Sequence, residues 1–199
     1  MKVVCLDMEG VLTPEIWQHV ARRTRIQELN LTTRDVKDYR ELMDKRLDIC
    51  AQHDVTLEAI QGYISELPVF EGARDFLDWI RERYQLIILS DTFNEFAGHF
   101  MRLLGRPTLF CHNIAYNAQT KRLEYSLRQD NAKAKAVQAI HSLDMRVCAA
   151  GDSYNDIHML KEADIATFFR APAGIKDQFP QFGNLQTYDE LRDFIARSL

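Results

Sequence analysis

Short apolar runs alternate along the chain with longer segments of helical periodicity. The apolar runs are Lys2–Leu6, Leu86–Leu89, Thr108–Cys111, Arg146–Ala150 and Ile165–Phe169. Several are apolar at successive positions, which is typical of strands buried on both faces of a parallel sheet. Between them, apolar residues recur at helical spacing, as in Phe76, Trp79, Ile80 and Tyr84. This alternation predicts an α/β fold, in which a Rossmann-like parallel sheet carries helices on both faces.

Two regions depart from this alternation. Residues 14–70 contain helical patterns near 15–28, 32–53 and 56–67 and no strand-like run. We expect them to form a small helical cap inserted after the first strand, with 1–13 and 71–199 forming the core. The second region is 111–128, where apolar and polar residues alternate after a turn-like segment, Asn117–Lys121. That pattern predicts an antiparallel hairpin.

Composition narrows the function classes. A chain of 199 residues with a net charge of −4 is the size of one domain with an insertion and has no basic footprint for nucleic acid. The apolar runs are too short to cross a membrane. The four cysteines include no C-x-x-C pair, which favours free thiols in the cytoplasm. The six histidines show no ligand spacing, and we expect all of them to be structural or surface residues.

Polar residues follow three of the predicted strands. The first strand leads into Asp7 and Glu9, the second, LIILSDT, into Ser90 and Asp91, and the third, VCAAGDSYND, into Asp152, Ser153, Asn155 and Asp156. A single acidic residue at a strand end is as easily a helix cap. Three such clusters are expected to meet, because ligands of open α/β sheets bind beyond the carboxyl ends of the strands.

The meeting of these clusters predicts a cation and a phosphate. So many carboxylates would repel one another unless a divalent cation were present, and Mg²⁺ prefers a few carboxylates together with phosphate oxygens. Ser90 can donate a hydroxyl to the phosphate, and Lys133 near a helix start can supply positive charge, with Lys135 as an alternative. A carboxylate can then accept the phosphoryl group covalently.

These residues resemble, in order and spacing, the four motifs of the haloacid dehalogenase superfamily. The motifs here are Asp7-Met8-Glu9-Gly10-Val11, Ser90, Lys133 and Gly151–Asp156. Within the superfamily the chain is similar to the phosphoserine phosphatases, through Asn131-Ala132-Lys133 and through Glu15 and Arg46. The D-x-E-G-V and S-D-T-F sequences resemble most a bifunctional subgroup, the phosphoserine:homoserine phosphotransferases of serine and threonine biosynthesis. A homodimer in the cytoplasm is also expected from this subgroup.

The resemblance implies a role for each candidate residue. Asp7 would be the nucleophile, and Glu9 the acid that protonates the leaving serine and then deprotonates the acceptor. Mg²⁺ would lie on Asp7, the main-chain carbonyl of Glu9 and Asp152. The remaining roles are phosphoryl binding by Ser90 and Lys133, binding of the substrate's ammonium and carboxylate by Glu15 and Arg46, contact with substrate by Asn155, and support of the site by Asp156.

Three positions depart from the usual phosphoserine phosphatase pattern. Glu9 replaces an Asp, Val11 replaces a Ser or Thr, and Asp91 replaces a Gly. Asp91 could attract an amino group or cap the following helix. Arg46 could equally pair with Glu41, Asp44 or Asp48 on its own helix, and Glu15 could be an ordinary first-turn acid after Pro14.

The sequence leaves rival functions open. A phosphatase for another small phosphomonoester, such as phosphoethanolamine, would use the same residues. A non-catalytic phosphoacceptor domain also combines acids, a hydroxyl and a lysine, but such domains lack a helical insertion of this size. The absence of G-x-x-x-x-G-K-[ST] and G-x-G-x-x-G means that any transfer would draw on a phosphoester rather than ATP.

Overall fold

The computed structural model describes residues 1–33, 35–36 and 38–199, and its centre is a seven-stranded sheet. The strand order is β4-β3-β2-β1-β5-β6-β7. The strands are β1 (Lys2–Leu6), β2 (Gln85–Phe93), β3 (Thr108–Asn117), β4 (Arg122–Ser126), β5 (Arg146–Gly151), β6 (Ile165–Phe169) and β7 (Gly183–Leu185). All neighbours pair in parallel except β3 and β4. The predicted α/β fold is therefore confirmed.

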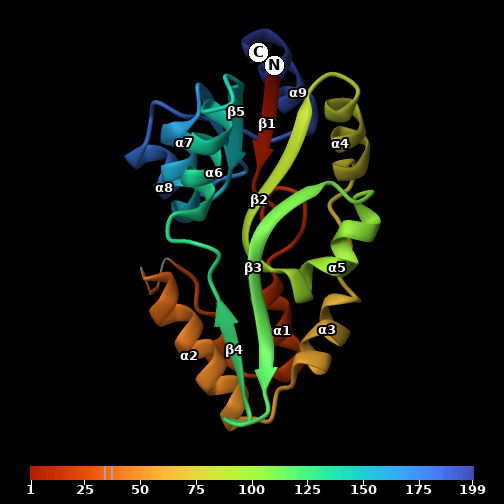
Figure 1. Ribbon diagram of the computed structural model, residues 1–199, viewed down its shortest axis with the longest axis vertical. Coiled ribbons are helices and arrows are strands. Elements are labelled where there is room, and N and C mark those ends of the chain that lie inside the picture. Colours follow the sequence, from red (N-terminus) through yellow and green to blue (C-terminus); the bar gives the residue numbers. More distant parts are fainter. Residues whose placement is uncertain (34, 37) are drawn as a thin grey trace.

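Helices cover both faces of this sheet, as Figure 1 shows. One layer contains α4 (Ala73–Arg81), α5 (Asn94–Leu103) and α9 (Tyr188–Ser198), and the other contains α6 (Ala132–His141), α7 (Ile157–Glu162) and α8 (Ala173–Gln178). The central strand, β1, contributes alternate side chains to two hydrophobic cores, one on each face of the sheet. Val4 and Leu6 belong to the core under the first layer, and Val3 and Cys5 to the core under the second.

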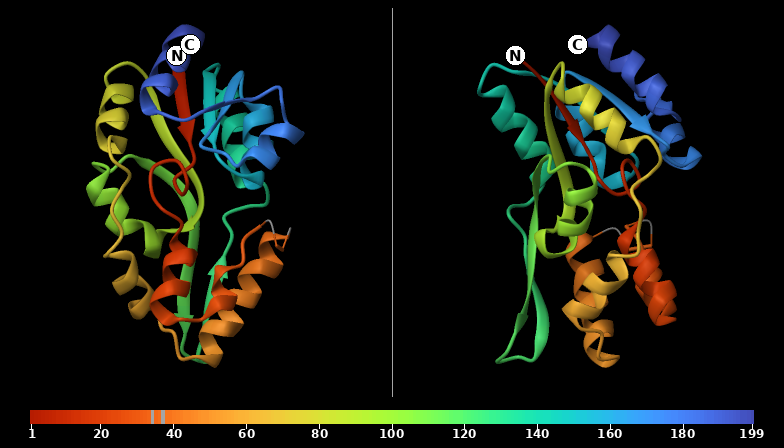
Figure 2. Two further views of the ribbon diagram at one scale, coloured as in Figure 1. Left: turned by 180° about the vertical axis from the view of Figure 1, so that it is seen from behind. Right: turned by 90° about the vertical axis from the view of Figure 1, so that its right-hand side faces the viewer.

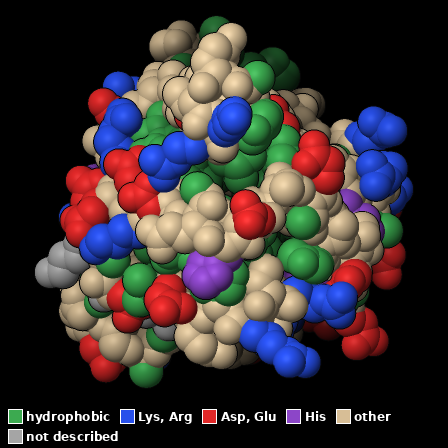
Figure 3. Space-filling view, turned by 90° about the horizontal axis from the view of Figure 1, so that it is seen from below, with side chains coloured by type: hydrophobic (Ala, Val, Ile, Leu, Met, Phe, Trp, Pro, Cys, Tyr) green, Lys and Arg blue, Asp and Glu red, His purple; other side chains and the backbone are tan. Residues whose placement is uncertain are grey.

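The segment between β1 and α4 is helical and lies beyond the carboxyl ends of the parallel strands (Figures 1 and 2). It contains α1 (Ile16–Thr24), the 3-10 helix η1 (Gln27–Asn30), α2 (Tyr39–Gln52) and α3 (Leu57–Ile64). The long β3–β4 hairpin extends alongside these helices, with β4 against α2. At this end of the molecule acidic and basic side chains are interspersed (Figure 3). The treatment of 14–70 as a separate cap domain stays a prediction.

Several local expectations can be compared with the structure. The hairpin is present, with its turn between Asn117 and Arg122. The helix expected from residue 32 begins only at Tyr39, because Asp38 caps it by accepting the backbone N–H groups of Arg40 and Glu41. Positions 34 and 37 of that expected helix lie outside the described residues. The short strand β7 and the 3-10 helix η2 (Tyr154–Asp156) were not predicted.

The cysteines are as the sequence predicts. All four cysteines are free and buried. Within the described ranges, no helix is both long enough and apolar enough to cross a membrane.

Candidate active site

Asp7 lies directly after β1, where the backbone is fixed by a neighbouring strand. Its N–H donates to the carbonyl of Ala150 on β5 at 3.0 Å. Its Oδ1 accepts the N–H of Met8 at 2.7 Å, and the residue is only 4% exposed. Burial raises the pKa of Asp7 well above its usual value, and Asp156 and Asp152 add to the effect while Lys133 opposes it.

Lys133 lies among three carboxylates, those of Asp7, Asp91 and Asp156. It is in the first turn of α6, after Asn131 at the N-cap, and is buried. Its Nζ is 2.7 Å from Asp156 Oδ1, 2.9 Å from Asp7 Oδ1 and 3.5 Å from Asp91 Oδ2. Burial acts to lower the pKa of Lys133, but the carboxylates outweigh it and raise the pKa well above the usual value, which keeps the amine charged. Lys135, the alternative from the sequence, is exposed.

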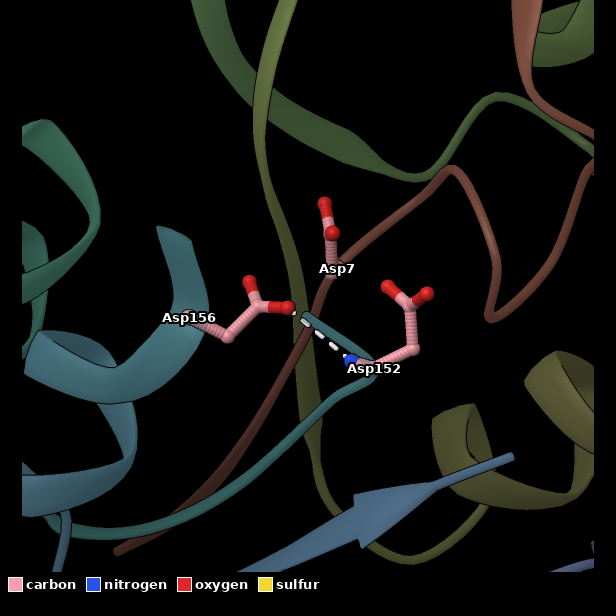
Figure 4. Close-up of side chains that lie close together, drawn as sticks. All are labelled: Asp7, Asp152 and Asp156. Atoms are coloured by element: carbon pink, nitrogen blue, oxygen red, sulfur yellow. Dashed lines mark hydrogen bonds between the residues drawn. The ribbon is translucent and has the colours of Figure 1, made fainter. Parts of the chain in front are cut away.

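Asp7, Asp152 and Asp156 form a buried cluster that could hold a cation (Figure 4). One carboxylate oxygen from each lies within 4.8 Å of the others. Asp156 is engaged on both oxygens, since Oδ1 binds Lys133 and Oδ2 accepts the backbone N–H groups of Asp152 and Ser153 at 2.9 and 3.1 Å. Asp156 therefore braces the turn, and Asp7 and Asp152 are the better placed metal ligands.

Gly10 makes room for this cluster. A Cβ at Gly10 would lie 2.3 Å from Asp152 Oδ2, and the backbone there has φ of +76°. Both conditions exclude a larger residue without movement of Asp152. The carboxylates of Asp7 and Asp152 are hard oxygen donors in a small number, so the residues present fit Mg²⁺.

A small cavity of about 100 Å³ lies in front of the acidic cluster. The predicted site residues that line it are Asp7, Glu9, Glu15, Arg46, Ser90, Asp91, Asp152 and Asn155. Lys133 and Asp156 contact this set from behind. The structure thus brings together every residue that the sequence singled out, although their roles remain predictions.

Glu9 lies in the loop after β1 and lines the small cavity. Its Oε2 accepts the N–H of Ile16 at the start of α1, at 2.9 Å. Burial and the neighbouring Glu15 raise the pKa of Glu9 to about 7, while the Ile16 N–H and Arg46 oppose the rise. A carboxyl group with a pKa near neutrality can both donate and accept a proton.

Arg46 reaches this cavity from α2 as a buried cation. Its Nη2 donates to the carbonyl of Leu31 at 2.6 Å, and its guanidinium lies 4.9 Å from the centre of the Trp17 ring. Burial lowers its pKa to about 10, so it stays charged at neutral pH. The sequence allowed Arg46 to pair with Glu41 or Asp48 on its own helix. In the structure Glu41 pairs with Lys45, and Asp48 pairs with Arg122. Glu15 occupies the N-cap position of α1 without a side-chain cap bond.

Asp91 lies where β2 departs from regular pairing with β3, between Leu89 and Phe93. Its Oδ2 accepts Asn155 Nδ2 at 2.9 Å, and its Oδ1 is 3.5 Å from His112 Nε2. Burial acts to raise the pKa of Asp91, but Lys133, His112 and Asn155 together lower it well below the usual range. Asp91 does not cap α5, whose N-cap is Phe93. Beside it, Ser90 Oγ accepts the N–H of Thr92 at 3.3 Å.

The sequence analysis missed two residues of this region. Tyr39 lines the small cavity and donates its hydroxyl to the main-chain carbonyl of Asp91 at 2.6 Å. His112 is 2% exposed and faces Asp91, so this histidine contacts a candidate site residue although its spacing in the sequence did not single it out. The continuation of β3 from the parallel sheet into the hairpin brings His112 there, and nothing in its local pattern signals this.

Comparison with known proteins shows the family of this chain. The sequence model of the haloacid dehalogenase-like hydrolases matches residues 1–164. A protein of Pseudomonas syringae pv. tomato named phosphoserine phosphatase is 49% identical over all 199 residues, which cover 84% of its length. A protein of Pseudomonas aeruginosa named phosphoserine phosphatase ThrH is 48% identical over 100% of this chain and 97% of its own.

Solved structures share the fold at lower identity. A phospho-aspartyl intermediate analogue of phosphoserine phosphatase superposes with a TM-score of 0.79 at 19% identity, over 98% of each chain. A substrate-bound phosphoserine phosphatase complex gives 0.79 at 20% identity, over 98% of this chain and 97% of that one. The family match, the full-length relatives and the strand-end acidic cluster together show that this chain belongs to the haloacid dehalogenase-like hydrolases.

Proposed function

We propose that the protein is a Mg²⁺-dependent phosphoserine phosphatase that also transfers the phosphoryl group from phosphoserine to homoserine. The observation that most supports this proposal is the position of Lys133 beside a small polar cavity. Its Nζ lies 2.9 Å from Asp7 and 2.7 Å from Asp156. The names of the full-length relatives, at 49% and 48% identity, support phosphoserine as the substrate. The S-D-T-F and D-x-E-G-V sequences support transfer to an alcohol in addition to hydrolysis.

In the first half-reaction, a carboxylate oxygen of Asp7 attacks phosphorus. The bond between phosphorus and the serine oxygen breaks as the bond to Asp7 forms, and Glu9 gives its proton to the serine oxygen. In the second half-reaction the bond to Asp7 breaks, phosphorus binds the acceptor oxygen, and the acceptor's proton returns to Glu9. A pKa of about 7 suits Glu9 to both steps.

The cavity residues would hold the substrate by charge. Ser90 and Asn155 line the cavity, and Lys133 contacts Asp7 beside it, so Ser90 and Lys133 would bind phosphoryl oxygens with Asn155 close by. Arg46 and Glu15 line the same cavity from the helical segment, and by charge Arg46 would bind the carboxylate and Glu15 the ammonium group. At about 100 Å³, the cavity accepts one small ligand at a time, which fits sequential use by donor and acceptor.

Mg²⁺ would lie on Asp7, Asp152 and the main-chain carbonyl of Glu9, with Asp156 bracing Asp152. When bound, it supplies the positive charge that keeps Asp7 ionised and attracts the phosphate. We further propose that 14–70 forms a cap over the core of 1–13 and 71–199. Four free thiols suit a cytoplasmic protein, and a homodimer is expected from the subgroup.

The decisive experiment combines a substrate panel with an acceptor. Phosphoserine, phosphothreonine, phosphoethanolamine and glycerol phosphate are each incubated with the protein and Mg²⁺, and phosphate release is measured. Phosphoserine should be preferred by kcat/KM, and chelation by EDTA should stop turnover until Mg²⁺ is restored. Addition of homoserine should yield phosphohomoserine. Equal rates across the panel would refute the substrate, and the absence of phosphohomoserine would refute the transfer.

A further inference from the structure

Two cavities of different size meet beside Asp91. The small cavity contains Asp7 and Glu9, whereas a larger one of about 870 Å³ extends past Asp91 and Lys133 toward α6 and α8. The described residues that line both are Thr33, Tyr39, Asp91 and Asn155. We call these four residues the partition. It separates the reacting groups from a space large enough to hold many water molecules.

The partition is built on Asp91, which is contacted by three further elements besides α6, whose Lys133 lies 3.5 Å from Oδ2. Tyr39, the first residue of α2, donates its hydroxyl to the main-chain carbonyl at 2.6 Å. Asn155, in η2, donates to Oδ2 at 2.9 Å. His112, on β3, places Nε2 at 3.5 Å from Oδ1. Because the helical segment, the turn after β5 and the sheet all contact one residue, the partition depends on their relative positions.

His112 is held in one tautomer by its second contact. Its Nδ1 accepts the backbone N–H of Arg128 at 3.1 Å, so the hydrogen of the neutral ring must lie on Nε2, which faces Asp91. Tyr39 is likewise a fixed donor, since burial and the charge of Asp91 raise its pKa well above the usual value. Tyr39 therefore binds the main chain of Asp91, and the N–H of His112 faces its carboxylate.

We propose that Tyr39 determines how the phosphoenzyme partitions between water and an alcohol, by keeping water of the larger cavity away from phosphorylated Asp7. This inference rests on the proposed function. After serine leaves, either acceptor gives the same exchange: the phosphorus–Asp7 bond breaks, a phosphorus–oxygen bond forms, and one proton passes to Glu9. Homoserine can use Arg46 and Glu15 to enter the small cavity. Water needs no such contacts, so a barrier against water is what favours the alcohol.

Tyr39 is the informative position because it belongs to the partition without belonging to the acidic cluster. Tyr39→Phe removes the hydrogen bond to Asp91 and keeps the ring. Tyr39→Ala removes the ring and joins the two cavities. A matched control is Tyr125→Phe, which removes a hydroxyl that donates to the carbonyl of Arg40, the next residue of α2, at 3.4 Å but lines neither cavity.

The test measures two products from one reaction. Each variant receives phosphoserine, homoserine and Mg²⁺, and the ratio of phosphohomoserine to inorganic phosphate is determined. Tyr39→Phe should lower this ratio about threefold, in line with loss of one hydrogen bond, and Tyr39→Ala about tenfold or more. Tyr125→Phe should keep the wild-type ratio. A ratio does not depend on the amount of folded protein, so partial unfolding of a variant would not change it.

A second measurement needs no acceptor alcohol. Wild-type enzyme is mixed with substoichiometric labelled phosphoserine, quenched in acid, and the decay of the phosphoenzyme is followed. Tyr39→Ala should shorten its lifetime about tenfold. A Tyr39→Ala enzyme with the wild-type product ratio and the wild-type lifetime would overturn the inference. If wild type makes no phosphohomoserine, the transfer half of the proposed function fails while the lifetime still decides the role of Tyr39; if no phosphoenzyme forms, both fail.

Discussion

The acidic cluster at the strand ends and the helical segment 14–70 are positioned in different ways. In the cluster, each buried polar group is held by others: Lys133 contacts three carboxylates, and Asp156 receives two backbone N–H groups. The helical segment packs its apolar side chains into the core, but α2 also reaches its neighbours through exposed ion pairs, Arg40 with Asp130 and Asp48 with Arg122. Exposed pairs of this kind contribute little to stability.

The difference teaches where the protein can tolerate change. Removing one member of a buried charge network leaves its partners without compensation, which is costly. An exposed ion pair is replaced by water at small cost. We therefore expect substitutions in the cluster to act strongly on the chemical step, whereas those in the helical segment act on substrate binding, on the choice of acceptor or only slightly on stability.

The largest effect is expected for Asp7→Asn. The amide cannot attack phosphorus, so turnover of phosphoserine should fall roughly 10⁴-fold or more. The fold should persist, because Asn fills the same space and Lys133 keeps its contact with Asp156 at 2.7 Å. Steady-state kinetics and circular dichroism measure the two effects. Turnover retained within tenfold of wild type would show that another group is the nucleophile.

A pair of glycine substitutions tests the two regions with the same chemical change. Gly10→Ala places a methyl group 2.3 Å from Asp152 Oδ2 at φ of +76°, so it should displace Asp152, weaken Mg²⁺ binding at least about tenfold and destabilise the fold by about 1–2 kcal/mol. Gly62→Ala lies within α3 with nothing near the added methyl group and should stabilise the fold by up to about 1 kcal/mol. Urea unfolding and Mg²⁺ titration of activity distinguish the two. If Gly10→Ala and Gly62→Ala changed the free energy of unfolding in the same direction, the difference between the acidic cluster and the helical segment would be contradicted.

Arg46→Lys tests substrate recognition by the helical segment. Lysine keeps the charge but loses the planar group that stacks on Trp17 and can bind a carboxylate twice. KM for phosphoserine should rise about 10–100-fold with a smaller change in kcat. Phosphoethanolamine, which has no carboxylate, is the control substrate and should be much less affected. The control variant is Arg22→Lys, an exposed arginine of α1. An equal loss with both substrates would remove Arg46 from carboxylate binding.

Much of the fold and the candidate site followed from local sequence pattern. The runs at Lys2–Leu6 and Ile165–Phe169 have the same bounds as β1 and β6, because strands buried on both faces are apolar at each position. Asp7, Ser90 and Asp152 could be placed together because parallel strands present their carboxyl ends at one edge. Lys133 followed from the start of a helix, although only its burial separates it from Lys135.

The rest depended on contacts between distant parts of the chain. Tyr39 and Asp91 are separated by 52 positions, and their bond requires the helical segment to be docked. His112 meets Asp91 only because β2 is irregular between Leu89 and Phe93 while β3 continues into the hairpin. Strand β7 has three residues, Gly183–Leu185, too few for any period to be recognised. No local periodicity encodes such features.

The smallest effect is expected from two exposed acidic residues. Asp164 is hydrogen-bonded to β5, and Asp130 pairs with Arg40 of α2. Asp164 accepts the N–H of Val147 on β5 at 2.7 Å and contacts His141 at 3.0 Å, and these contacts lower its pKa. A carboxyl group whose folded pKa is lowered adds stability above its ordinary pKa, and that stability is lost as pH falls through the folded pKa. Asp164→Asn should therefore cost less than about 1 kcal/mol at pH 7, since Asp164 is partly exposed, and the cost should shrink as the pH falls through the folded pKa.

Asp130→Asn gives the matched control because the pKa of Asp130 is also lowered, but by the exposed side chain of Arg40. Salt screens an exposed ion pair and leaves a hydrogen bond to backbone largely intact. In 1 M NaCl at pH 7, the effect of Asp130→Asn on urea unfolding should disappear, whereas most of the effect of Asp164→Asn should persist. If salt removed both effects equally, the contact with Val147 would contribute nothing beyond surface charge, and the distinction between contacts within the core and contacts to the helical segment would not extend to exposed residues.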